Sequence, residues 1–211
     1  MNDNGIEELI ENKIRIDYNE ICNYIPAGSK VLDLGCGDGE LLRMLKEKKN
    51  VKGQGIEINP IFITTCIKKR LSVLQCDIED GLKEYPDNSF DYVIMNQTLQ
   101  AIEKPLDIIF EMLRVGKHAV VGFPNFGYFK IRLYLFLIGR MPKTGCFPYE
   151  WYETPNIHPF TINDFCRLII DKNINVIYKK FIGGYRVLRN IFPNYFAKSG
   201  LFVLTQKLKT Q

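Results

Sequence analysis

Three glycines at positions 35, 37 and 39 separate a short apolar run from a helix-like pattern. The run at residues 30–34 reads as a buried strand, and the leucines at positions 41, 42 and 45 repeat with helical spacing. Glycines allow the backbone to turn sharply and to approach a ligand that side chains would obstruct. The stretch therefore predicts a ligand-binding turn between a strand and a helix of an α/β fold.

Strand-like and helix-like segments continue to alternate after this turn. Strands are expected at residues 51–58, 72–76, 90–95 and 118–123, and helices at 60–70 and 106–114. Beyond a segment rich in aromatics and proline, a helix is expected at 161–171 and strands at 176–181 and 201–205. The alternation predicts an α/β fold with a Rossmann-like, doubly wound, mostly parallel seven-stranded sheet, an antiparallel C-terminal edge strand and an aromatic helical insertion after the fifth strand.

The length of 211 residues is typical of one domain. Within it we expect an N-terminal helix at 1–28 and a cofactor-binding half at 29–125. An aromatic lid or partner segment is expected at 126–160, and a C-terminal helix with edge strands at 161–211. The polar N-terminus and the lack of a long uncharged apolar stretch favour a cytoplasmic protein with no membrane span.

The residue after the last glycine, Glu40, separates three classes of ligand. A phosphate-binding P-loop requires Lys there, and a dinucleotide turn of the G-x-G-x-x-G type requires its third glycine there. A carboxylate would also oppose a phosphate at the start of a helix. The remaining pattern, from Asp33 to Gly39, resembles motif I of class I S-adenosylmethionine (SAM)-dependent methyltransferases.

That resemblance implies a SAM or S-adenosylhomocysteine site at the carboxyl ends of four strands. Glu57 would accept the ribose hydroxyls, Asp77 would lie by the adenine, and Asn96 would face the methionine part. The alternatives are a plain tight turn, helix caps and solvated acids. The predicted cofactor-binding residues are Asp33, Gly35, Cys36, Gly37, Gly39, Glu57, Ile58, Asp77, Ile78 and Asn96.

Few residues suggest catalysis or metal binding. His158 is the candidate general base, because it follows an aromatic cluster where small-molecule methyltransferases can place a histidine; a hydrogen-bonded structural histidine is the alternative. Cys36 reads as a small packing residue. With two histidines and no C-x-x-C among six cysteines, no metal site is expected.

The glycine turn and several blocks beyond it resemble the methionine biosynthesis protein MetW family. They are residues 33–40, 55–58, 90–94, 97–102, 111–116, 123–127, 139–142 and 148–158. The resemblance implies a SAM-binding, methyltransferase-like protein of methionine biosynthesis that works with homoserine O-acyltransferase (MetX) as its partner. A SAM-dependent methyltransferase acting on a small molecule is the alternative, and one acting on RNA is less favoured. SAM could be substrate, regulator or structural ligand.

The net charge of +4 hides two unlike halves. Residues 1–122 hold 15 Lys/Arg and 20 Asp/Glu, whereas residues 123–211 hold 13 Lys/Arg and 4 Asp/Glu. The apolar run at 126–138 could be a lid, a docking surface or a membrane-surface helix. Because the basic residues are scattered and no RNA-binding motif is present, we favour docking to an acidic face of a partner over nucleic acid.

Overall fold

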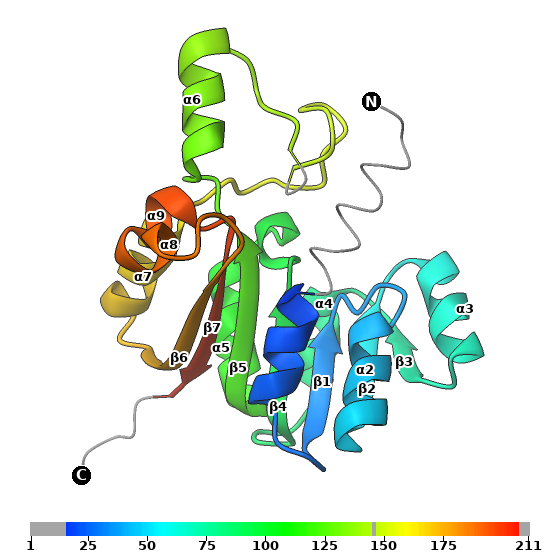
Figure 1. Cartoon of the computed structure of the whole chain (residues 1–211). Coiled ribbons are helices and arrows are strands. Elements are labelled where there is room, and N and C mark those ends of the chain that lie inside the picture. Colours follow the sequence, from blue (N-terminus) through cyan, green and yellow to red (C-terminus); the bar gives the residue numbers. More distant parts are fainter. Residues whose placement is uncertain (1–15, 145–146, 207–211) are drawn as a thin grey trace.

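The computed structural model describes residues 16–144 and 147–206. Residues 16–24 are helical, whereas residues 25–28, expected to belong to the same helix, form a bend and a turn. Residues 1–15 of the expected N-terminal helix lie outside the described residues. The chain forms one seven-stranded sheet in the order β3-β2-β1-β4-β5-β7-β6, with helices on both faces (Figure 1). This confirms the predicted doubly wound α/β fold.

Six strands run in one direction, and the last strand in sequence, β7, runs against them. Strands β1 to β5 pair in parallel, whereas β7 is antiparallel to both β5 and β6. Strand β7 lies between these two neighbours, so β6 is the outermost strand. The strands are β1 (Lys30–Leu34), β2 (Lys52–Glu57), β3 (Ser72–Gln75), β4 (Phe90–Asn96), β5 (Gly116–Pro124), β6 (Asn175–Ile182) and β7 (Ser199–Thr205).

The connections after β1 and β4 leave the sheet in opposite directions. Strand β1 is followed by β2 on one side, and β4 is followed by β5 on the other. In open α/β sheets, ligands bind in the crevice at the carboxyl ends of strands where the order reverses in this way. The topology therefore places the candidate site above β1 and β4, beside the glycine turn.

Two apolar layers hold the helices against the sheet. One layer joins Leu32 and Phe123 of the sheet to Ile109 and Phe165 of the covering helices, and the other joins Val31 and Ile94 to residues of helix 16–24 and α2. The helices are α2 (Glu40–Lys49), α3 (Pro60–Lys68), α4 (Ile78–Gly81), α5 (Pro105–Val115), α6 (Phe129–Ile138), α7 (Ile162–Asp171), α8 (Leu188–Ile191) and α9 (Pro193–Phe196), with 3₁₀ turns η1 (Leu82–Glu84) and η2 (Leu99–Ala101).

Local sequence fixes where several of these helices begin. Thr161 and Asp164 form a reciprocal capping box at the start of α7, as their spacing predicts. Asn59 caps α3 with its side chain, and Pro60 occupies the first helical turn. These caps fix the residues at which α7 and α3 begin.

Helix α6 does not cover the sheet. Figure 1 shows it rising from the carboxyl end of β5 and pointing away from the layers below. Ile131 is its one buried residue, although nearly all its side chains are apolar. Within the described ranges, no helix is long and apolar enough to cross a membrane.

Candidate functional site

All three glycines of the turn after β1 have left-handed backbone conformations. The φ angles are +69° at Gly35, +55° at Gly37 and +77° at Gly39. A Cβ atom on Gly35 would lie 2.9 Å from the Thr98 side chain, and one on Gly39 would lie 2.5 Å from Leu71 Cδ1. A Cβ on Gly37 would meet no atom within 4 Å. Two glycines therefore allow tight packing, and the third leaves open space above the turn.

Glu57, at the end of β2, holds this turn in place. Its Oε2 accepts a hydrogen bond of 2.8 Å from the backbone N–H of Gly37. Its Oε1 accepts from the N–H groups of Ile58 and Asn59, at 3.0 and 2.9 Å. Each carboxylate oxygen can accept more than one hydrogen bond, so further acceptor capacity remains for a hydroxyl. The predicted ribose-binding acid thus also joins β2 to the turn after β1.

Asp33, at the end of β1, is a buried carboxyl with an acidic neighbour. It is 3% exposed. Burial, and secondarily the charge of Glu57, raise its pKa to about 7 from an ordinary value of 3.8. Among the described residues neither acid forms an ion pair. A buried acidic pair of this kind favours a cation and disfavours a phosphate.

Acids further out on the same turn are neutralised by basic side chains. Lys69 Nζ lies 2.7 Å from Asp38 and 3.4 Å from Glu40, and Arg43 forms a 2.6 Å ion pair with Glu40. The spacing of Glu40 and Arg43 within one helix signals their pair. Lys69 directly follows α3, and sequence reasoning missed it because no local pattern links this residue to the glycine turn.

The helix at residues 16–24 also reaches the acidic turn. Burial, together with the charges of Asp33 and Asp38, raises the pKa of Tyr18 above its ordinary value. Next to it, Asp17 Oδ2 accepts a 2.9 Å hydrogen bond from Gln97 Nε2, just after β4. Sequence reasoning named none of these three side chains, since they are brought together from segments 80 residues apart.

The predicted adenine-side residues lie at the ends of β2 and β3. Asp77 is exposed and caps α4, with its Oδ1 accepting a 2.8 Å hydrogen bond from the Glu79 N–H. Ile58 is 61% exposed and Ile78 is half-buried. Asp77 is therefore a helix cap, the alternative reading for an acid at a strand end, and its second oxygen remains available to a ligand.

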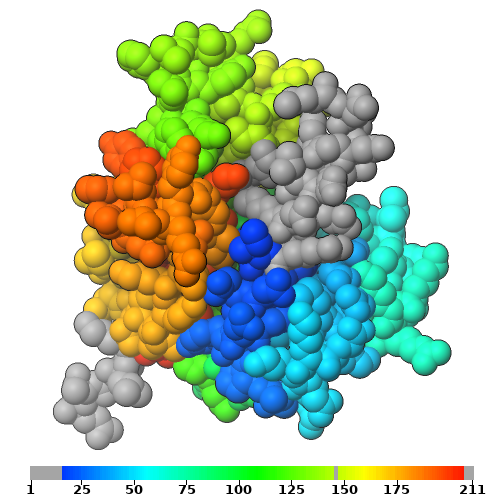
Figure 2. All heavy atoms as spheres, in the orientation of Figure 1, coloured from blue at the N-terminus to red at the C-terminus, as the bar shows by residue number. Residues whose placement is uncertain are grey.

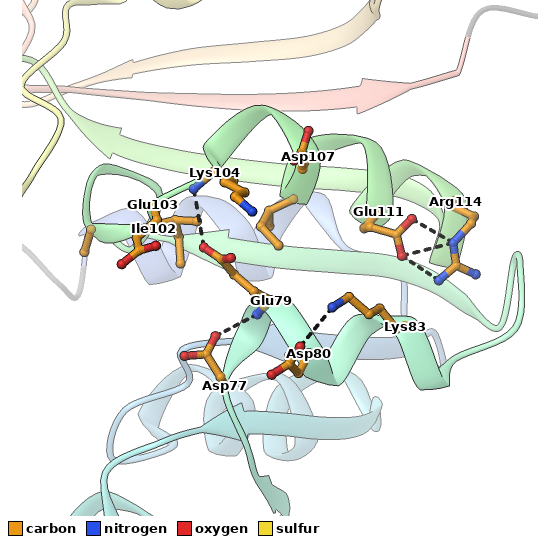
Figure 3. A pocket seen from close by; sticks show the side chains of 12 residues that line it. Asp77, Glu79, Asp80, Lys83, Ile102, Glu103, Lys104, Asp107, Glu111 and Arg114 are labelled. Carbon is orange, nitrogen blue, oxygen red and sulfur yellow. Dashed lines mark hydrogen bonds and ion pairs between the residues drawn. The ribbon is translucent and has the colours of Figure 1, made fainter.

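An acidic groove of about 960 Å³ starts at Asp77 and continues between α4 and α5 (Figure 3). Its acids are partly compensated: Lys83 pairs with Asp80 at 2.9 Å, and Arg114 pairs with Glu111 at 2.7 Å. The groove is lined by six acids in all, namely Asp77, Glu79, Asp80, Glu103, Asp107 and Glu111. It adds to the negative surface next to the predicted adenine position and is unsuited to binding phosphate.

Asn96 ends β4 and packs against the neighbouring strand. Its side-chain oxygen occupies the space where a Cβ on Gly122 would lie, so a glycine is required on β5 at that point. The same Oδ1 is buried and has no hydrogen-bond partner within the described part of the chain. A buried acceptor without a partner is costly, and a bound ligand is one group that could satisfy it.

Cys36 is buried and serves as packing in the turn. Its Sγ would lie 2.5 Å from a Cβ on Gly55, so it fills the space above β2. Burial and the negative charge of Asp33 raise the pKa of the Cys36 thiol, and a hydrogen bond that the thiol donates to Cys66 raises it further. A protonated, buried thiol is a poor nucleophile.

His158, the candidate general base, lies beside η2. Its backbone N–H donates to the Gln100 carbonyl at 3.0 Å, and its ring Nε2 lies 3.4 Å from the Glu103 carbonyl oxygen. It lines an apolar cavity of about 270 Å³ with Leu99 of η2 and Phe165 of α7. His158 is exposed, and these contacts are compatible with the structural alternative; its role as a general base stays a prediction.

No metal centre accompanies this site. Across residues 16–144 and 147–206, no group of three or more His, Cys, Asp or Glu side chains is placed to hold a metal ion. The chemistry available at the turn is therefore that of buried carboxylates, backbone N–H groups and an unsatisfied amide oxygen.

Comparison with known proteins gives a family and a fold. The profile of the family described as methionine biosynthesis protein MetW matches residues 15–204. The chain is 38% identical, over 170 residues, to a bifunctional methionine biosynthesis protein MetXA/MetW of Rhodopirellula baltica. This alignment covers 76% of the chain and only 27% of that relative. A demethylmenaquinone methyltransferase of Bacillus licheniformis is 23% identical, with 76% of the chain and 77% of the relative covered.

Solved structures share the whole fold at low sequence identity. A SAM-dependent methyltransferase from Archaeoglobus fulgidus superposes with a TM-score of 0.66 and 16% identity, covering 92% of this chain and 93% of that one. The fold is therefore that of the class I SAM-dependent methyltransferases.

Proposed function

Because this chain belongs to the MetW family of methionine biosynthesis proteins, we propose that it binds SAM or S-adenosylhomocysteine above β1 and β4 and acts with homoserine O-acyltransferase (MetX). The observation that carries the cofactor proposal is the turn itself. Gly37 faces open space with a left-handed backbone, while Asp33 and Glu57 lie beside it as buried acids. A cationic ligand with a ribose matches that combination of space, charge and hydrogen-bond acceptors.

Each of the four polar site residues would bind a different part of the ligand. Glu57 would accept from the ribose hydroxyls while it continues to hold Gly37, and Asp77 would bind the adenine edge with its free oxygen. Asp33 would face the cationic end, and Asn96 would supply an acceptor to the methionine part. SAM, when bound, supplies an electrophilic methyl group on a sulfonium.

Gly37 and Gly28 provide a matched test of the cofactor site. Both have left-handed φ angles, +55° and +77°, and at both an added Cβ meets nothing within 4 Å. Alanine at either position costs about 1–2 kcal/mol of stability, because the backbone strain is the same. Gly28 lies before the amino end of β1, whereas the glycine turn follows the carboxyl end of the same strand. Gly37→Ala should therefore weaken SAM binding in calorimetry by about tenfold or more, and Gly28→Ala should leave it unchanged. Equal binding by both variants rejects the site.

The proposed partnership rests on the relative that carries both names in one chain. The present chain spans about a quarter of that relative, which leaves room there for a second protein unit. Proteins that act together are joined in this way when a fixed proximity helps them. Acyltransferase assays with and without this chain, each with and without SAM, test the idea. A rate that responds to neither addition, together with no co-purification, rejects it.

A second candidate is a free-standing methyltransferase acting on a small molecule. It is favoured by the likeness to the demethylmenaquinone methyltransferase, which extends over most of both chains. Under this alternative His158 would act as general base. Release of S-adenosylhomocysteine with a defined acceptor, lost in His158→Ala at unchanged SAM affinity, would support it.

A further inference from the structure

Helix α6 carries a concentration of exposed apolar side chains that the fold does not use. Phe136 is 85% exposed, and four further apolar side chains of the helix are 42–65% exposed. Soluble proteins rarely leave such a patch uncovered unless it contacts something. The exposed apolar residues of α6 are Leu133, Tyr134, Phe136, Leu137 and Ile138.

The base of α6 is nevertheless firmly attached. Asn125 is fully buried just before the helix, and its amide group donates to the carbonyls of Asn194 and Ala197 at 3.1 and 2.9 Å. Its Oδ1 accepts from the Gly127 N–H at 3.0 Å. Arg132 donates to the Gly127 carbonyl at 2.6 Å and stacks on the Tyr195 ring at 4.4 Å. The helix is thus held in its exposed position by specific contacts.

Residues 185–197, which include the groups that anchor α6, continue its exposed apolar surface. Phe129, in the first turn of α6, contacts Tyr185 and Phe196 with ring centroids 5.9 and 5.6 Å apart. Figure 2 shows α6 standing beyond α8 and α9 on the same side of the molecule. We use the name α6 surface for the exposed apolar residues of α6 together with those of residues 185–195. The latter are Tyr185, Val187, Leu188, Ile191, Phe192 and Tyr195.

Basic residues predominate around the α6 surface. No Asp or Glu occurs in the sequence between residues 112 and 149, nor after residue 171. Five exposed basic residues of these stretches flank the α6 surface: Lys130, Arg140, Lys143, Arg186 and Lys198. Lys143 forms an ion pair with Glu150 at 2.9 Å. A complementary surface would be apolar in the centre and acidic at its rim.

We propose that the α6 surface docks into an acidic-rimmed apolar groove on homoserine O-acyltransferase; this inference rests on the proposed function. Beyond Arg132, the helix is apolar on every side, a pattern typical of a helix enclosed by protein. With ten residues the helix is about 15 Å long, and its projecting C-terminal half could enter a groove on a partner. The relative that carries both units in one chain supplies the partner.

Two other occupants fit the surface less well. A second copy of the chain would bring the same basic border against itself, because symmetric dimers pair identical patches. An anionic membrane surface selects helices with one polar face along their length, and the charges of α6 are confined to its first turn at Lys130 and Arg132.

The test compares two single variants in binding to the purified acyltransferase. Phe136→Glu places a charge at the most exposed apolar position of α6. Ile67→Glu introduces the same residue at a 62% exposed position of α3, which lies beside β3 at the far edge of the sheet. Both should fold, since neither side chain is buried, and unchanged thermal unfolding together with unchanged SAM binding checks this. Phe136→Glu should weaken acyltransferase binding by about tenfold or more, while Ile67→Glu should bind like the unaltered chain. Arg140→Glu should lower the association rate and its dependence on salt.

The possible outcomes distinguish a failure of the α6-surface proposal from a failure of the proposed partnership with the acyltransferase. If the unaltered chain and both variants bind the acyltransferase equally, the surface is wrong and the proposed function stands. If the unaltered chain does not bind at all, the partnership fails and the surface proposal fails with it. Sedimentation of the chain alone and binding to phosphatidylglycerol vesicles complete the test. A dimer or vesicle complex that Phe136→Glu abolishes, with acyltransferase binding intact, reassigns the surface and overturns the proposal.

Discussion

The Glu57 carboxylate accepts a 2.8 Å hydrogen bond from the Gly37 N–H and thereby joins the end of β2 to the turn after β1. One side chain thus shapes the turn and lines the space above it. A change at Glu57 should therefore affect folding and ligand binding together, whereas a change at an exposed acid should affect neither.

Glu57→Gln measures this double role. The amide can keep one acceptor oxygen, but its NH₂ group cannot accept from the second set of backbone N–H groups. We expect a loss of about 1–3 kcal/mol in the free energy of unfolding and SAM binding weakened by about tenfold or more. Glu47→Gln, which removes an exposed ion pair with Arg43, is the control and should change both quantities little. Intact SAM binding in Glu57→Gln would contradict the assignment.

Asp33 should make stability depend on pH below neutrality. Its pKa is raised to about 7 in the folded chain, so an unfolded chain gives up this proton at lower pH. The folded state therefore holds the extra proton between about pH 4 and 7, and the contribution of Asp33 to stability falls as pH rises through that window. Asp33→Asn cannot ionise. In urea unfolding, the variant should gain stability relative to the unaltered chain from pH 4 to pH 7, by a few kcal/mol at most. A constant difference across this range would exclude the raised pKa.

Asn125→Ala should loosen the attachment of α6. The substitution leaves buried N–H and carbonyl groups of three segments without their partner, including the Asn194 carbonyl and the Gly127 N–H. We expect a loss of about 3 kcal/mol, seen as a lower Tm, because each buried group left unsatisfied is costly. Asn190→Ala removes an exposed amide nearby and should leave Tm nearly unchanged. If Asn125→Ala matched this control, the network would contribute little.

The capping box of α7 offers a test of coupling between two residues. The Thr161 side chain accepts from the Asp164 N–H, and the Asp164 side chain accepts from the Thr161 N–H at 2.9 Å. Each alanine substitution should cost about 1 kcal/mol of stability. The double variant should cost less than the sum, since the two side chains also hydrogen-bond to each other at 2.7 Å. Strict additivity in chemical denaturation would argue against a reciprocal box.

The sequence predicts elements well where short-range chemistry sets them. The bounds of β1 and α2 follow from the apolar run and the glycines between them, and α7 begins where its cap residues predict. Such features depend on neighbours in the chain, so their patterns are visible without a structure. The C-terminal strand β7 is antiparallel as expected, but it lies between β5 and β6, so the prediction that it forms the edge of the sheet is wrong.

Features that depend on distant segments escape sequence reasoning. The expected ribose-binding role of Glu57 gives no sign that it also clamps Gly37, 20 residues away. The contact of Asp17 with Gln97 joins the first helix to the end of β4, and no periodicity encodes it. The direction of α6 is equally hidden, because an apolar helix that packs inward and one that projects have the same sequence pattern. The residues of the candidate site were named from a family motif; their roles remain predictions.

The position of β7 also has a consequence for synthesis on the ribosome. Strand β5 pairs with β7, which begins about 75 residues after β5 ends, and the outermost strand β6 emerges before the strand that links it to the sheet. Until β7 has emerged, the edge of β5 and the whole of β6 have no strand to pair with. Nascent chains stopped before Ser199 should thus have five strands assembled and an open edge prone to aggregation. The final seven-residue strand completes the sheet in a late, long-range step of folding.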